Sequence, residues 1–333
     1  MGNTEQTLIQ YRPLGRSDLE VSSVAMGCWP ITGMTSLDVN ETDSRMTLEA
    51  AVNAGINLFD TAYCYGRDGE SERMIARSLG SRRSEIVIAT KGGIEWNRDG
   101  SRLHDASPAT LRRQCAESLS RLGVDHIDLY YLHAPAPDTP IEDSAGAIGE
   151  LISEGKIRYA GASNCTLEEL KRFHTQCPLT AIQPHYNMLQ REIEHEILPW
   201  ALQEGISALT YWPLLKGLLA GRLPRDFKFR EGDGRAKYPM FQGDEWVKNQ
   251  DFLDTLRSIS KATQRSVAEL VVNWTIHQPG ITSAICGAKR PYQIVESAQA
   301  MTFELSSDLL RQIQEALAKR GTPLSTAAVP SNT

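Results

Sequence analysis

Residues 157–186 are IRYAGASNCTLEELKRFHTQCPLTAIQPHY, and they contain one full copy of the pattern that decides the fold. An apolar run of strand length at 157–164 is followed by an amphipathic segment of helix length at 167–176, and then by a second apolar run at 181–186. Such runs predict buried strands, and apolar residues at helical spacing predict a helix packed against them. Strand, helix and strand in this order are typical of a βαβ unit with parallel strands.

The same pattern extends over most of the 333 residues. Strands are predicted at 21–29, 57–62, 86–91, 127–133, 157–164, 181–186, 207–212 and 282–288. Helices are predicted near 45–54, 70–79, 108–122, 142–154, 167–176, 194–204, 266–278 and 291–300. The chain therefore alternates strands and helices throughout.

Helix boundaries are marked by residues that satisfy free backbone groups. Thr166 with Glu169, and Ser266 with Glu269, have the spacing of a capping box, and Ser107 precedes a proline at the first helical position. Glycines, which favour the left-handed conformation after a helix, follow six of the segments. They are Gly55, Gly80, Gly123, Gly155, Gly205 and Gly280.

Parallel strands joined by helices form either a closed barrel or an open doubly wound sheet. An open sheet that binds a dinucleotide normally carries G-x-G-x-x-G after its first strand, whereas this first strand ends in MGCW at 26–29. We therefore predict an α/β fold, a single-domain (β/α)₈ TIM barrel at residues 1–320, followed by a disordered tail at 321–333. We also predict an N-terminal β-hairpin at residues 11–21 that plugs the barrel, and an extra helix at the C-terminus. A long functional loop is predicted at residues 213–244.

Composition excludes several classes of protein. The formal net charge of −6 and the pI of about 5.7 leave no broad basic surface for nucleic acid. Six cysteines without a C-x-x-C pair indicate free thiols in a reducing compartment. Residues 1–12 lack an apolar signal segment, and no apolar run reaches the roughly 18 residues of a membrane span. We expect a cytoplasmic protein without a membrane partner or a metal, and the oligomeric state stays open.

Polar residues at strand ends predict the active site, because a barrel places catalysis at the carboxyl ends of its strands. Asp60 and Tyr65 follow the second strand, Lys91 the third and His133 the fourth. An ammonium about 4 Å from a phenol, at an effective dielectric of about 20, stabilises the phenolate by roughly 4 kcal/mol. We therefore expect Lys91, kept charged by Asp60, to lower the pKa of Tyr65, and His133 to orient a carbonyl oxygen.

The segment NLFDTAYCYG at 57–66 resembles the aldo-keto reductase motif, in which an aspartate and the catalytic tyrosine lie five residues apart. Lys91 and His133 match the rest of that family's catalytic tetrad, and the resemblance extends from about residue 12 to about residue 317. It implies an NADP(H)-dependent oxidoreductase that reduces aldehydes or ketones, or catalyses the reverse, with Tyr65 as general acid/base. Its partner would be a small carbonyl or alcohol substrate.

The resemblance also implies a cofactor site. GASN at 161–164 and Gln183 resemble the positions that bind the nicotinamide carboxamide. Tyr211 resembles the aromatic residue that stacks on the nicotinamide ring. ICGAKRP at 285–291 resembles the site for the adenosine phosphate. Trp29, Tyr63 and Trp96 are candidates for the cavity lining. The expected cofactor-binding residues are Trp29, Asp60, Ser163, Asn164, Gln183, Tyr211, Trp212, Pro213, Leu214, Gly217, Gly287, Lys289, Arg290, Gln293 and Glu296.

Lys289 and Arg290 stand at a predicted helix start, where free N–H groups attract phosphate, and two cations there favour NADP over NAD. Trp212 and Ser297 depart from the family pattern, which usually has a small residue and an asparagine there. Two alternatives remain. One is a cofactor-binding regulatory subunit resembling potassium-channel β subunits, and the other is a metal-dependent barrel that uses Asp60, His133 and His185.

Overall fold

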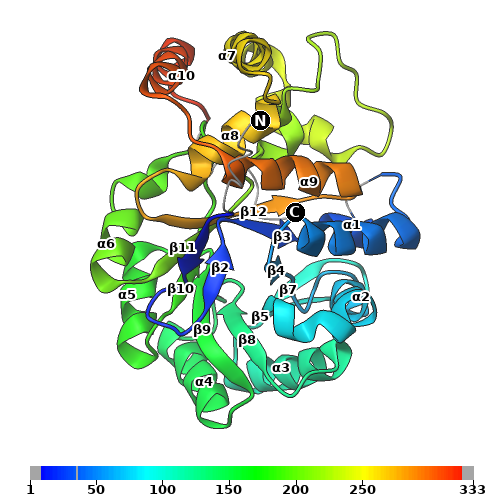
Figure 1. Cartoon of the computed structure of the whole chain (residues 1–333). Helices are drawn as coiled ribbons and strands as arrows, with labels where there is room; N and C mark the ends of the chain where they lie inside the picture. Colours follow the sequence, from blue (N-terminus) through cyan, green and yellow to red (C-terminus); the bar gives the residue numbers. More distant parts are fainter. Residues whose placement is uncertain (1–8, 35–36, 325–333) are drawn as a thin grey trace, which may run out of the picture.

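The barrel predicted from the strand pattern is present in the computed structural model, which describes residues 9–34 and 37–324 (Figure 1). Eight parallel strands close in the order β3-β4-β5-β8-β9-β10-β11-β12, with β12 paired to β3. They are β3 (Val24–Gly27), β4 (Leu58–Asp60), β5 (Val87–Gly92), β8 (Ile127–Leu132), β9 (Ile157–Ser163), β10 (Ala181–Gln183), β11 (Ser207–Tyr211) and β12 (Ile281–Gly287). The predicted fold class is confirmed.

Helices surround the barrel on its outside (Figure 1). They are α1 (Glu41–Asn53), α2 (Glu70–Leu79), α3 (Pro108–Leu122), α4 (Ile141–Ser153), α5 (Leu167–Gln176), α6 (Ile197–Glu204), α7 (Gly243–Thr263), α8 (Val267–Ile276), α9 (Pro291–Gln299) and α10 (Ser307–Arg320). The predicted C-terminal extra helix is α10. It packs against α7, where the buried Arg320 donates a hydrogen bond of 3.0 Å to Asn249.

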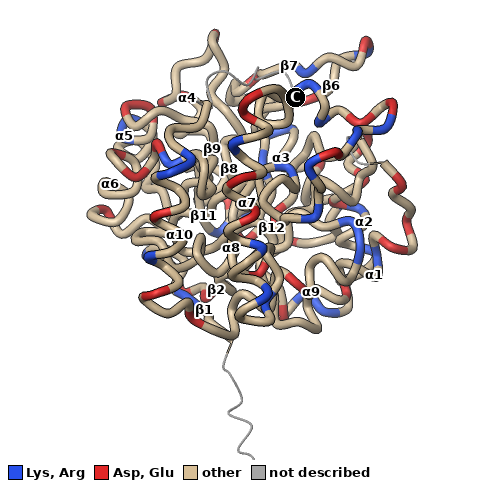
Figure 2. Tube along the Cα trace, turned by 90° about the horizontal axis from the view of Figure 1, so that it is seen from above, with Lys and Arg blue, Asp and Glu red and all other residues tan. Residues whose placement is uncertain are grey.

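Two small hairpins lie at opposite ends of the molecule (Figure 2). The predicted hairpin consists of β1 (Tyr11–Pro13) and β2 (Glu20–Ser22), and its Leu14 and Val21 are fully buried in the cluster that fills the barrel interior. It therefore closes the amino-terminal end of the barrel. The second hairpin, β6 (Ile94–Trp96) and β7 (Arg102–His104), follows β5 at the carboxyl ends of the strands and was not predicted.

The predicted helix starts at Ser107, Thr166 and Ser266 are confirmed, since each side chain accepts a hydrogen bond from the backbone N–H of the third residue of its helix. Gly80 was wrongly predicted as a left-handed stop, because its φ is −55° and a 3-10 segment follows at Gly80–Glu85. The other five glycines have positive φ.

Several predicted boundaries were wrong. The first helix begins at Glu41 because Asn40 caps it, and the segment at 194–204 splits into a 3-10 turn at Glu192–Glu194 and α6. Helix α7 was missed. Its N-cap, Gln242, makes no side-chain cap hydrogen bond, so the start carries no capping signal. The last two residues of the loop predicted at 213–244 belong to α7, and the rest of it contains the 3-10 segments Leu215–Ala220, Gly234–Lys237 and Pro239–Phe241.

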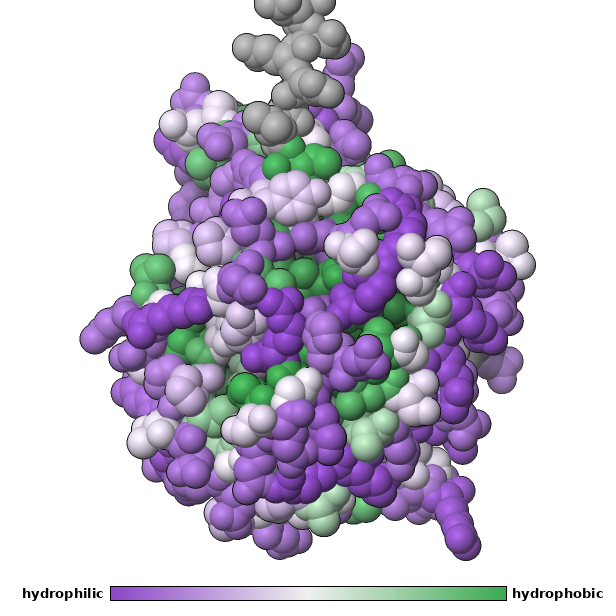
Figure 3. Space-filling view, turned by 60° about the horizontal axis from the view of Figure 1, so that its bottom comes forward, coloured by the Kyte–Doolittle hydropathy of each residue, from purple (hydrophilic) through white to green (hydrophobic). Residues whose placement is uncertain are grey.

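In Figure 2, Lys and Arg positions are interspersed with Asp and Glu positions along the chain. In Figure 3, hydrophilic side chains predominate and hydrophobic ones lie in the recesses between them. All six cysteines are free thiols and five are buried. None of the described helices is both long and apolar enough to cross a membrane. Of the predicted tail, 325–333 lie outside the described residues.

Candidate active site

A buried ion pair lies at the carboxyl end of the barrel interior. The Lys91 ammonium donates hydrogen bonds of 2.7 Å to Asp60 Oδ1 and 2.8 Å to the carbonyl oxygen of Thr61. The Gln183 amide donates to the other Asp60 oxygen at 2.6 Å. Asp60 and Lys91 are 3% and 1% exposed, so neither reaches water. Burial raises the pKa of Asp60, and the contacts with Lys91 and Gln183 oppose that shift.

Tyr65 and His133 lie beside this ion pair. The Lys91 Nζ is 4.9 Å from the centroid of the Tyr65 ring, and the rings of Tyr65 and His133 meet edge to face with centroids 5.9 Å apart. The four side chains predicted from strand ends β4, β5 and β8 therefore converge on one place. A phenol and an imidazole beside a buried ammonium can act on one small polar ligand: the phenol can transfer a proton to it, and the imidazole can form a hydrogen bond with it.

The expectation that Lys91 would lower the pKa of Tyr65 is wrong. Burial raises the pKa of Tyr65 well above its usual value, and the negative charge of Asp60 adds to the shift. Asp60, 2.7 Å from Lys91, carries a negative charge that opposes any stabilisation of a phenolate by the ammonium. The phenol of Tyr65 is thus protonated at neutral pH.

His133 is also neutral. Burial lowers its pKa well below the usual value, and the positive charges of Lys91, Arg102 and His104 add to the effect. A neutral imidazole keeps one N–H donor. Its Nδ1 lies 3.6 Å from the Cys64 sulfur, and its backbone oxygen accepts a hydrogen bond of 2.9 Å from Asn164.

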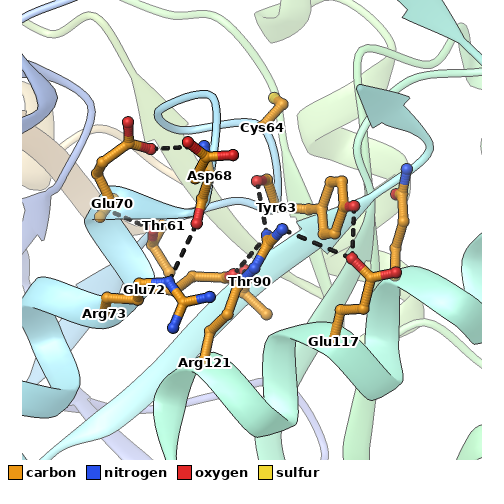
Figure 4. Close-up of polar contacts among 12 residues, drawn as sticks. Thr61, Tyr63, Cys64, Asp68, Glu70, Glu72, Arg73, Thr90, Glu117 and Arg121 are labelled. Carbon is orange, nitrogen blue, oxygen red and sulfur yellow. Dashed lines mark hydrogen bonds and ion pairs between the residues drawn. The ribbon is translucent and has the colours of Figure 1, made fainter. Parts of the chain in front are cut away.

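A second polar network holds the loop that carries Tyr65 (Figure 4). The buried Glu72 of α2 accepts hydrogen bonds from Thr90 at 2.7 Å and from Arg121 at 3.3 Å, and Arg121 also donates to the carbonyl oxygen of Tyr63 at 3.2 Å. The Tyr63 hydroxyl donates to Glu117 at 2.7 Å. Because Thr90 precedes Lys91, the network connects β5, α2, α3 and the loop that carries Tyr65. Tyr63 thus contacts helix α3, and nothing places it in the predicted cavity lining.

The residues predicted for the nicotinamide end lie next to the tetrad. Asn164, with φ of 57°, accepts a 2.8 Å hydrogen bond from the Tyr211 hydroxyl and donates to Ser163 at 3.2 Å. The Tyr211 ring is stacked on His185 with centroids 5.3 Å apart. Gln183, predicted to bind the carboxamide, donates one amide N–H to Asp60.

The loop after β11 has an unusual backbone. Trp212, Leu215, Lys216 and Gly217 have φ of 59°, 44°, 55° and 88°. Positive φ at non-glycine residues stores strain and is concentrated at functional sites. Lys216, which sequence reasoning missed, places Nζ 3.7 Å from the Trp212 ring centroid, and burial beside Lys237 and Arg102 lowers its pKa to about 7.

The predicted adenosine end lies at the start of α9. The Gln293 side chain accepts from the backbone N–H groups of Lys289 and Arg290 at 3.0 and 3.1 Å, so it caps the helix. Lys289 donates to the carbonyl oxygen of Leu37, and Arg290 pairs with Asp43 at 2.6 Å. Glu296, assigned to adenine, pairs with Arg222 at 2.7 Å. The other predicted positions, Pro213, Leu214 and Gly287, follow β11 or end β12.

Trp29 and the second hairpin form the rim near Tyr65. The Trp29 ring meets the Tyr65 ring edge to face at 5.0 Å, and the Trp96 indole donates to the carbonyl oxygen of Cys64 at 2.8 Å. Arg102 lies against both indoles, with Cζ 5.2 and 5.0 Å from the two ring centroids. Sequence reasoning missed Arg102, because a short hairpin with partly exposed residues has no periodic signal.

Comparisons with known proteins identify the family. The family model described as "Aldo/keto reductase family" matches residues 23–318. This chain belongs to the aldo-keto reductase family. Relatives of this aldo-keto reductase include "Aldo-keto reductase YhdN" of Bacillus subtilis, 33% identical with 93% of this chain and 94% of that protein covered. Another is the "NADH-specific methylglyoxal reductase" of Escherichia coli, 34% identical with 92% and 98% covered.

Solved structures of the family resemble the reductase closely. The glycerol dehydrogenase AKR11B4 from Gluconobacter oxydans has a TM-score of 0.88 and 32% identity, with 95% of this chain and 98% of that chain covered. The holo form of AKR11C1 from Bacillus halodurans has a TM-score of 0.75 and 30% identity, with 93% and 96% covered.

Among the described residues, no group of three or more histidine, cysteine, aspartate or glutamate side chains is placed to hold a metal ion.

The ion pair makes a prediction about stability. Lys91→Met leaves the carboxylate of Asp60 buried without its cation, so it should lower the free energy of unfolding by roughly 3–5 kcal/mol. Adding Asp60→Asn removes that charge and should restore roughly 2 kcal/mol. Urea denaturation measures the free energy of unfolding of both variants. Arg172→Met is the control, because the exposed Arg172–Glu142 pair contributes less than about 1 kcal/mol. Strictly additive losses in the double variant would contradict the pairing.

Proposed function

We propose that this aldo-keto reductase uses NADP(H) to reduce the carbonyl group of a small aldehyde or ketone, with Tyr65 as the proton donor. The observation that carries the proposal is the convergence of a protonated phenol, a neutral imidazole and a buried ion pair at the carboxyl end of the barrel. When bound, the nicotinamide supplies a hydride, which forms the new C–H bond. The C=O π electrons then reside on oxygen and need a proton.

Tyr65 meets that need because it holds its proton at neutral pH. An alkoxide is a stronger base than a phenolate, so the proton moves from the Tyr65 oxygen to the substrate oxygen as charge develops there. Neutral His133 donates a hydrogen bond that orients the same oxygen before transfer. Lys91 and Asp60 act as a fixed pair beneath the ring. At neutral pH the protonated Tyr65 is thus ready to donate a proton for carbonyl reduction. Alcohol oxidation requires the phenolate form of Tyr65, which is rarely populated at that pH.

Several features support the nicotinamide cofactor. Asn164, Tyr211 and Ser163 lie beside the tetrad, where they would hold the nicotinamide, and the strained loop after β11 presents Lys216 to an anion such as the pyrophosphate. Trp29, beside Tyr65, would contact the nicotinamide end. These roles are assigned by position together with the family resemblance.

The preference for NADP rests on the cations at the adenosine end. Burial lowers the pKa of Lys289, Asp38 opposes that shift, and the nearby charges of Arg235, Arg290 and Arg230 add to it. Such a cluster can bind the extra phosphate of NADP. The Escherichia coli relative is described as NADH-specific, so the preference is a property of individual members and has to be tested here.

A catalytic role is favoured over the channel-subunit alternative because the relatives carry the names of reductases and a dehydrogenase. The tetrad is also complete in this chain. A regulatory protein would bind the cofactor but turn over very slowly, which the following experiment distinguishes.

Tyr65→Phe removes only the phenol oxygen. It should lower kcat for NADPH-dependent reduction of reactive aldehydes by about 10²–10⁴-fold, the usual contribution of a general acid. Affinity for NADPH, measured by quenching of tryptophan fluorescence, should stay within about threefold of the wild type. Near wild-type turnover in this variant would show that another group supplies the proton.

Lys216 gives the cofactor affinity a pH dependence. Its pKa of about 7 in the free protein should rise when a pyrophosphate binds beside it, so binding takes up a proton above pH 7. The Kd for NADPH should therefore increase by up to about tenfold per unit between pH 7 and 9. Calorimetry on Lys216→Met should give weaker binding at pH 7 and a flat profile. A slope that persists in this variant would rule out Lys216 as its source.

Cofactor choice is tested at Lys289. Lys289→Met should weaken NADPH binding by about 10–100-fold, the range for hydrogen bonds to a charged group. NADH lacks only the extra phosphate, so it serves as the internal control and should change less than about threefold. Wild-type kcat/KM values that favour NADH, or equal losses for both cofactors, would contradict the NADP assignment.

A further inference from the structure

The hairpin β6–β7 places one cation at the mouth of the active site. Trp96 and Arg102 are directly paired residues of its two strands. The indole N–H of Trp96 is hydrogen-bonded to the carbonyl oxygen of Cys64, the residue before Tyr65. The position of Arg102 relative to Tyr65 is therefore set by the same contact that anchors the hairpin.

Arg102 is close to the reacting groups. Its guanidinium carbon lies 5.2 Å from the Trp29 ring centroid, and that ring lies 5.0 Å from the ring of Tyr65. Its positive charge also acts on His133, whose pKa it helps to lower. A ligand whose carbonyl lies between Tyr65 and His133 would thus extend past Trp29 toward Arg102.

Two of the acidic groups near this mouth are paired with other cations. Asp60 is bonded to Lys91 and Gln183, and Glu95 of the hairpin pairs with Arg113 at 2.5 Å. Arg102 is partly exposed, and its positive charge also acts on Lys216, whose pKa it helps to lower. A guanidinium has five N–H donors in a planar fork, enough to bind a carboxylate in addition to the contacts that Arg102 makes within the protein.

We propose that Arg102 is a specificity-determining residue that binds a carboxylate on the substrate, so that the preferred substrates are aldehyde acids. The proposal rests on the reductase function and names its substrate class. The indoles of Trp29 and Trp96 pack against the guanidinium, which orients its N–H groups and lowers the entropy lost on binding. One indole ring separates Arg102 from Tyr65, so the carboxylate should be several bonds from the carbonyl.

A matched pair of aldehydes tests this. 4-Carboxybenzaldehyde and 4-nitrobenzaldehyde have nearly the same shape, and only the first carries a charge. Arg102→Met should lower kcat/KM for the carboxylate by about 10–100-fold, mainly through KM, and for the nitro compound by less than about threefold. Arg102→Lys should recover part of the loss, because it keeps the charge without the fork. Arg98→Met, in the exposed turn of the same hairpin, is the control and should leave both unchanged.

The outcomes separate the two levels of the proposal. Turnover of 4-nitrobenzaldehyde by the wild type establishes the reductase function independently of Arg102. Two results would overturn the carboxylate site. One is an equal loss of kcat/KM for both aldehydes in Arg102→Met. The other is a wild-type kcat/KM that is higher for the uncharged aldehyde, with the same ratio of the two values in Arg102→Met. Absence of turnover with either aldehyde would instead overturn the proposed function.

Discussion

The site depends on one interaction, the ion pair between Lys91 and Asp60 inside the barrel. Two opposite charges can be buried only if each is hydrogen-bonded, and here the carboxylate is held by the ammonium and by Gln183, while the ammonium also reaches a backbone carbonyl. These contacts connect strands β4, β5 and β10 at their carboxyl ends. The ion pair beside Tyr65 is therefore held in place by several hydrogen bonds and has no net charge.

Burial of the site determines the protonation states of the side chains beside the pair. Burial is the largest cause of the pKa shifts of Tyr65 and His133, the charges of Asp60 and Lys91 add to these shifts, and both side chains are uncharged at neutral pH. A neutral phenol is a proton donor and a neutral imidazole a hydrogen-bond donor, which suits the reduction of a carbonyl. The positive charges lie farther out, at Arg102 and Lys216, where they can bind anionic parts of a substrate and a cofactor.

The sequence predicted the barrel and the tetrad because both follow from local rules. Apolar runs locate the strands, capping residues such as Thr166 locate the helices, and a barrel brings strand ends together. Features without a local signal were missed: α7 starts without a side-chain cap, and Arg102 lies on a short, partly exposed strand. The sign of the pKa shift of Tyr65 was wrong because it depends on how burial and Asp60 outweigh Lys91, and only three-dimensional distances decide that.

The most direct test is to observe the ionisation of Tyr65 itself. In protein labelled with ¹³C at the tyrosine ζ carbon, the resonance absent from Tyr65→Phe belongs to this residue, and its chemical shift reports the phenolate. The account predicts that this resonance keeps the shift of a neutral phenol up to at least about pH 10, the ordinary tyrosine pKa. Titration with a midpoint near neutral pH would show that the phenol is acidified in the resting enzyme, and would contradict it.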